Sequence, residues 1–177
     1  LLVIPSAGRT WPMFYTGAAL VAVGEALRLW AVHHIGVISR TRSDRLGPLI
    51  SSGPFARVRN PLYLGNIGLW AGFTVSAGLL WMTPVVLGLL ALEYHAIVRW
   101  EETLLSARIG GPYRRYVERV PRWFPRWRAD LPDAPGGRET QSPSPAPADH
   151  AWRHTLGSER STLVAIALGY LLLWVKG

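Results

Sequence analysis

Long apolar runs separated by arginine-rich segments are the feature that most limits the fold of this chain. The runs cover Pro12–Val32, Leu62–Leu80, Pro84–Trp100 and, more briefly, Ser161–Val175. A helix of about 20 apolar residues, rising about 1.5 Å per residue, crosses the hydrocarbon core of a bilayer. A water-soluble domain of 177 residues could not bury so many apolar side chains. We therefore predict an all-α integral membrane protein with about four transmembrane helices.

The second and third runs are separated only by a short turn around Trp81–Thr83, and Pro84 suits the first turn of a helix. This arrangement predicts a tight helical hairpin. The second run also carries small residues, which allow helices to pack closely in lipid. These are Gly65, Gly68, Gly72 and Gly78.

From Glu101 to Val120, apolar and charged residues alternate at near-helical spacing, and Gly110-Gly111-Pro112 interrupts the pattern. The pattern predicts that the third helix continues beyond the membrane and is followed by a turn and a short amphipathic helix on the interface. We expect the arginines and tryptophans that follow to anchor the chain at the interface. They are Arg122, Trp123, Arg126, Trp127 and Arg128.

The chain divides into four predicted parts. A first transmembrane helix occupies residues 1–35, and a membrane core with a basic loop, the hairpin and the amphipathic helix occupies residues 36–128. A flexible linker rich in Pro and Ser follows at 129–155, and a C-terminal transmembrane helix at 156–177. The last apolar run is short, and we favour a spanning helix over a re-entrant one. Whether another helix precedes Leu1 is left open.

The net charge of +8 comes from 19 basic and 11 acidic residues. The arginines concentrate in 36–60 and 99–160, between the apolar runs, which is the distribution of cytoplasmic loops in a membrane protein. We therefore expect an integral protein of the bacterial inner membrane with these segments in the cytoplasm. This placement of the charge argues against a nucleic-acid partner.

The absence of Cys excludes a disulfide scaffold, thiol catalysis and cysteine-ligated zinc. His33, His34 and His95 have no paired carboxylates at a matching depth, so no metal site is predicted. Glu25 and Arg28 are three residues apart in the first run and share a helix face. We favour an ion pair buried in the bundle, and the alternative is a polar lining for a substrate cavity.

The hairpin would bring Asn60–Tyr63 and Glu101 to the same membrane depth, where they would form a partly buried polar pocket. Glu101 and Glu102 stand at a helix end, where paired carboxylates are usually a solvated face. Adjacent helical residues point about 100° apart, so we expect only one of these two carboxylates to face inward.

These separated pieces resemble the isoprenylcysteine carboxyl methyltransferase superfamily, which also includes phospholipid methyltransferases and bacterial members. The pieces are the run Gly53 to Gly65, the pair Glu101-Glu102, Gly110, Tyr113 and Val120-Pro121. The resemblance covers about Leu46 to Pro125. It implies a helical bundle that binds S-adenosylmethionine (SAM) within the membrane and without a Rossmann domain.

By this resemblance, a set of residues would line the SAM pocket and Glu101 would close it. The lining residues are Pro48, Leu49, Ile50, Phe55, Asn60, Pro61, Leu62 and Tyr63. The chemistry suits the cofactor, because aromatic side chains can sandwich adenine and a carboxylate can hold the ammonium group. The sulfonium suits an aromatic face.

The chain departs from the prenylcysteine members at two positions. It has Asn60 where they have His, and Ile97 where they have a substrate-binding Arg. Asn hydrogen bonds but cannot take a proton, and Ile cannot pair with a carboxylate. Methylation of a prenylcysteine carboxylate is therefore disfavoured.

The resemblance implies methyl transfer from SAM to a lipophilic acceptor, which is a carboxylate, amine or hydroxyl of a lipid or prenylated molecule. The candidate catalytic residues are Arg59, Asn60, Arg99 and Glu102. Either arginine could hold an anionic head group, and Glu102 is a candidate base together with Glu93 and His95.

Two alternatives stay open: a membrane reductase that uses NADPH, and a non-catalytic membrane module that binds a partner. The identity of the acceptor and the oligomeric state are also open.

Overall fold

The computed structural model describes residues 10–35, 49–126 and 148–176, and these ranges contain helices and no strand. In chain order the elements are α1 (Trp11–Ile35), the 3-10 helix η2 (Gly53–Ala56), α2 (Pro61–Ser76), α3 (Met82–Ile109), α4 (Gly111–Arg119) and α5 (Ala148–Lys176). The prediction of an all-α membrane protein is confirmed. In the described ranges, three helices are long and apolar enough to cross a membrane: α1, α3 and the Thr155–Val175 part of α5. The fourth predicted span, α2, is a helix of 16 residues.

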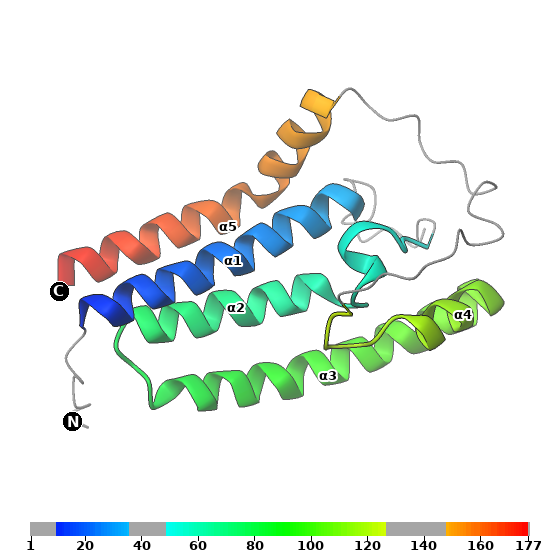
Figure 1. Cartoon of the computed structure of the whole chain (residues 1–177), viewed down its shortest axis with the longest axis horizontal. Coiled ribbons are helices and arrows are strands. Elements are labelled where there is room, and N and C mark those ends of the chain that lie inside the picture. The colour runs from blue at the N-terminus through cyan, green and yellow to red at the C-terminus, as the bar shows by residue number, and fades with distance from the viewer. Residues whose placement is uncertain (1–9, 36–48, 127–147, 177) are drawn as a thin grey trace.

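Helices α1 and α2 pack along each other over most of their length, with α5 on the other side of α1 and α3 beside α2 (Figure 1). Glycines make the α1–α2 contact close. A Cβ on Gly24 would lie 2.7 Å from the carbonyl oxygen of Gly65, and a Cβ on Gly72 would lie 2.6 Å from that of Gly17. Small residues therefore let the two backbones approach each other, as the sequence predicts.

The hairpin between α2 and α3 is also confirmed, with a turn at residues 77–81. Gly78 has a φ of 73°, a left-handed conformation that favours glycine in this turn. The Thr74 and Thr83 hydroxyls are 2.9 Å apart and hydrogen bonded, which ties the last turn of α2 to the first turn of α3. The turn thus fixes how the two helices face each other.

Helix α5 begins at Ala148, within the range 129–155 expected for the linker, and the division of the chain into four parts stays a prediction. The linker residues 129–147 lie outside the described residues. Thr155 and Glu159, upstream of the apolar run, are buried, and the Thr155 hydroxyl is 3.5 Å from His33 Nδ1 on α1. The early turns of α5 therefore have partners on α1, which explains why the helix extends beyond the apolar run.

The amphipathic helix predicted after Gly110 is present as α4, and its apolar face packs on protein. Tyr113, Tyr116 and Val120 are buried in one cluster, with Leu49 and Leu105 packed against it. The interfacial position of α4 stays a prediction, but the face expected to enter lipid is covered by the chain itself. Of the proposed anchor residues that follow, Trp127 and Arg128 lie outside the described residues.

Candidate functional site

The start of α2 meets the C-terminal part of α3 through a hydrogen bond between two predicted site residues. The Tyr63 hydroxyl donates to Glu101 Oε1 at 2.9 Å, and both side chains are partly buried. The Tyr63 ring also packs against Tyr94 of α3, with ring centroids 4.7 Å apart. Pro61 at the first turn of α2 fixes where that helix begins, and thus which residues of α2 face α3. The result is a carboxylate beside two aromatic rings.

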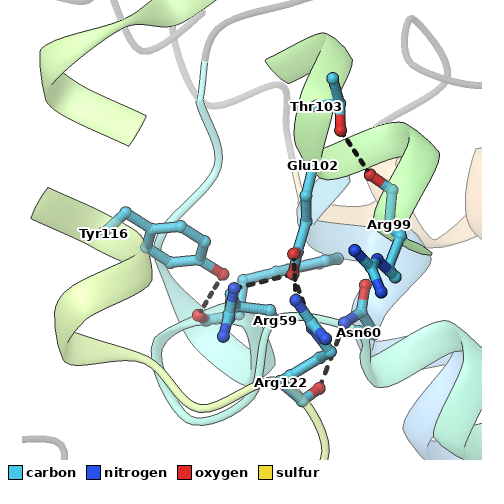
Figure 2. Close-up of polar contacts among 8 residues, drawn as sticks. Arg59, Asn60, Arg99, Glu102, Thr103, Tyr116 and Arg122 are labelled. Carbon is cyan, nitrogen blue, oxygen red and sulfur yellow. Dashed lines mark hydrogen bonds and ion pairs between the residues drawn. The ribbon is translucent and has the colours of Figure 1, made fainter. Parts of the chain in front are cut away.

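The segment before α2 is held by the segment after α4. The backbone N–H of Arg59 donates to the carbonyl of Pro121 at 2.9 Å, and that of Arg126 donates to the carbonyl of Arg57 at 3.1 Å. The Asn60 side chain donates to the Arg122 carbonyl at 3.1 Å (Figure 2). Asn60 therefore joins two segments that are distant in the sequence. The position of Asn60 directly before Pro61 predicts the start of a helix but does not predict this contact.

Glu102 lies between two arginines, as Figure 2 shows. Arg59 Nη1 donates to Glu102 Oε1 at 2.7 Å, and Arg122 donates to the same oxygen through Nε at 3.0 Å. Arg122 Nη2 also contacts the second carboxylate oxygen at 2.5 Å. These hydrogen bonds raise the pKa of the Arg122 guanidinium above its usual range. Because two guanidiniums share one carboxylate, the group keeps a positive charge.

Tyr116 connects α4 to the loop before α2. Its hydroxyl donates to the Phe55 carbonyl at 2.9 Å (Figure 2). Burial raises the pKa of the Tyr116 phenol well above its usual value and also raises that of Tyr113. The two tyrosines are therefore neutral packing groups that hold the loop carrying Phe55 against α4.

The predicted site residues occupy different environments. Leu49, Ile50, Phe55, Arg59, Asn60, Leu62, Tyr63, Glu101 and Glu102 are partly buried, Pro61 is buried, Arg99 is exposed and Pro48 lies outside the described residues. The expectation that only one of Glu101 and Glu102 faces inward is wrong, because Glu101 contacts α2 while Glu102 contacts Arg59 and Arg122. The 100° between them directs each carboxylate to a different neighbour.

Sequence reasoning missed the site contacts of two residues. The sequence predicts Arg122 as an interfacial anchor next to the Val120-Pro121 motif, but it does not predict that Arg122 binds Glu102. Tyr94 was not singled out in the apolar third run, and it packs against Tyr63. A polar aromatic residue in an apolar run is a signal that could have marked it.

A second ionic group lies between α1, α2 and α5. Arg28 Nε is 3.2 Å from Glu25 Oε2, which confirms the predicted ion pair, and the Glu25 side chain is 8% exposed.

In the parts of the chain that the structure describes, no three His, Cys, Asp or Glu side chains are placed to hold a metal ion together.

The sequence of the chain is similar to those of known proteins. Residues 12–110 match the phospholipid methyltransferase family. The chain is 31% identical over 123 residues to the cobalt-zinc-cadmium resistance protein CzcN of Cupriavidus metallidurans, covering 66% of this chain and 52% of that protein. It is 28% identical over 123 residues to the nickel-cobalt-cadmium resistance protein NccN of Alcaligenes xylosoxydans xylosoxydans, covering 66% and 54%. The chain thus spans about half the length of the curated relatives it matches. No solved structure matches it.

Proposed function

Because the chain belongs to the phospholipid methyltransferase family, we propose that it transfers a methyl group from SAM to a lipophilic acceptor at the cytoplasmic face of the membrane. The observation that carries the proposal is the hydrogen bond from Tyr63 to Glu101, which places a partly buried carboxylate beside aromatic rings at the meeting of α2 and α3. The matched range contains all of these residues. The family match favours this reaction over an NADPH-dependent reduction and over a module without catalysis.

The residues around Glu101 fit the cofactor by their chemistry. A carboxylate satisfies an amino-acid ammonium group through a charge-assisted hydrogen bond. The Tyr63 and Tyr94 rings offer faces that suit a flat base or a cation. When bound, SAM supplies a methyl group already activated on its sulfonium, so the residues of the chain have to bind, orient and exclude water. In this proposal, Glu101 binds the cofactor, and Tyr63 orients the carboxylate by holding one of its oxygens.

The acceptor would be lipid-soluble and carry an anionic head group. Helix α3 exposes apolar side chains such as Val85, Leu89 and Leu92, which suit contact with lipid. The Arg59, Arg122 and Glu102 group keeps a positive charge close to the start of α2. This charge favours a phosphate or carboxylate on the acceptor.

The metal resistance in the names of the two relatives is a property of those proteins. For this chain we propose only the methyl transfer, with a lipid or another lipophilic molecule as the acceptor.

The proposal is tested by calorimetric titration of the detergent-purified protein with S-adenosylhomocysteine, the product of the cofactor. We expect micromolar binding that falls by about tenfold or more in Glu101→Gln, because a hydrogen bond to a charged group contributes about 1.5–3 kcal/mol. Glu93→Gln is the matched control, since it removes the same charge from an exposed position of α3. No binding by folded wild-type protein would overturn the proposal.

A further inference from the structure

Arg28 of α1 connects three helices within the bundle. Its Nη2 donates to Glu159 Oε2 of α5 at 2.6 Å, and the Glu159 side chain is 0% exposed. Its Nη1 donates to the side-chain oxygen of Asn66 on α2. Charged groups in spanning helices are costly to bury and are rare without a partner or a function. The planar guanidinium suits this position, because its fork of donors can serve acceptors on two helices at once.

Asn66 is three residues after Tyr63 on α2, so the two side chains share a face of that helix. The Tyr94 ring packs at 4.7 Å against the Tyr63 ring, whose hydroxyl donates to Glu101 at 2.9 Å. Each of these contacts involves a buried or partly buried group. The α2 residue that Arg28 holds is therefore about one helical turn from the α2 residue that holds Glu101.

We propose that Arg28 and Glu159 are positioning residues for the cofactor site. By holding Asn66, they fix the rotation of α2 and thereby the orientation in which Tyr63, one turn away, donates to Glu101. Helix α5 is then part of the catalytic unit, although it lies outside the residues 12–110 that match the family. The role rests on the proposed function, because its consequence is the affinity for the cofactor.

A double-mutant cycle tests whether Glu159 acts through Tyr63. We expect Glu159→Gln to weaken S-adenosylhomocysteine binding by no more than Tyr63→Phe does, which is about threefold to tenfold. The double variant with Tyr63→Phe should bind no more weakly than Tyr63→Phe alone, because the same interaction is already lost. Arg160→Gln, an exposed position next to Glu159, should bind like the wild type. Losses that add in the double variant would overturn the proposal.

A second readout needs no cofactor and separates this proposal from the proposed function. In protein labelled with 3-fluorotyrosine, the fluorine resonance of Tyr63 is assigned from the signal that Tyr63→Phe removes. Glu159→Gln should shift this resonance, and Arg160→Gln should not. If the resonance shifts but the wild type binds no cofactor product, the positioning is supported and the proposed function fails. An unshifted resonance overturns the positioning.

Glu159→Gln leaves Arg28 with one charged partner fewer, and the variant could fail to fold. Asn66→Leu removes the hydrogen bond between Arg28 and α2 while it keeps the Arg28–Glu159 ion pair. It should produce the same shift of the Tyr63 resonance and the same lack of additivity with Tyr63→Phe. Binding and resonance equal to the wild type in this variant would contradict the proposal independently of Glu159.

Discussion

Tyr63 donates a hydrogen bond of 2.9 Å to Glu101, so two residues 38 positions apart meet across the hairpin. The meeting depends on the hairpin turn, which sets α2 beside α3, and on Pro61, which begins α2 close to Tyr63. A tyrosine hydroxyl that holds a carboxylate restricts its rotamers before any ligand arrives. Such pre-organisation lowers the cost of ordering side chains on binding.

Tyr63→Phe should weaken binding of S-adenosylhomocysteine by about threefold to tenfold, less than Glu101→Gln. The variant removes one hydrogen bond, worth about 0.5–1.5 kcal/mol net, and keeps the ring against Tyr94. The measurement is calorimetric titration of both variants in the same detergent. Equal losses in the two variants would mean that Tyr63 binds the cofactor directly and does more than hold the carboxylate.

Glu102→Gln should lower the free energy of unfolding of the detergent-solubilised protein by about 1–3 kcal/mol. The substitution removes the negative charge that two arginines share. The ion pair between Arg59 and Glu102 is largely buried, because their side chains are 13% and 17% exposed. Arg122→Gln should have a smaller effect, because that side chain is 31% exposed. The check is the loss of circular dichroism on heating. A stable Glu102→Gln variant that loses turnover would instead support the predicted role of Glu102 as a base.

The stability of the fold should fall as the pH rises above about 10. Burial raises the pKa of Tyr116 above its ordinary value of 10.0, so the unfolded chain loses this proton at a pH where the folded chain keeps it. Unfolding is therefore favoured increasingly through this alkaline window. Tyr116→Phe should make the dependence shallower, with Tyr113 retaining part of it. Melting temperatures between about pH 8 and about pH 11 measure the slope, and identical slopes would rule out this account.

Gly72→Ala should destabilise the bundle by about 1–3 kcal/mol, because its Cβ would lie 2.6 Å from the Gly17 carbonyl oxygen. Gly88→Ala in α3 is the matched control, since a Cβ there meets nothing within 4 Å. The control should be neutral or gain up to about 1 kcal/mol from helix propensity. Thermal melts and the elution profile of the purified variants compare the two substitutions. If both behave alike, the close approach of α1 and α2 does not contribute to stability.

The sequence by itself determined the features that repeat along single helices. Apolar runs predicted the helices, the glycines of α2 predicted its close packing, and the spacing of Glu25 and Arg28 predicted their ion pair. These patterns are local, because residues three or four positions apart share a helix face whatever the rest of the chain does.

The tertiary structure decided which inward-facing side chains meet. Arg28 and Glu159 are 131 residues apart, and the sequence offers many other carboxylates for that arginine. The sequence likewise does not single out Arg122 as the partner of Glu102. The amphipathic pattern of α4 is compatible with packing on lipid or on protein, and in the structure its apolar face packs on protein. Partners of this kind depend on the rotation and depth of each helix, which are set by the packing of all of them together.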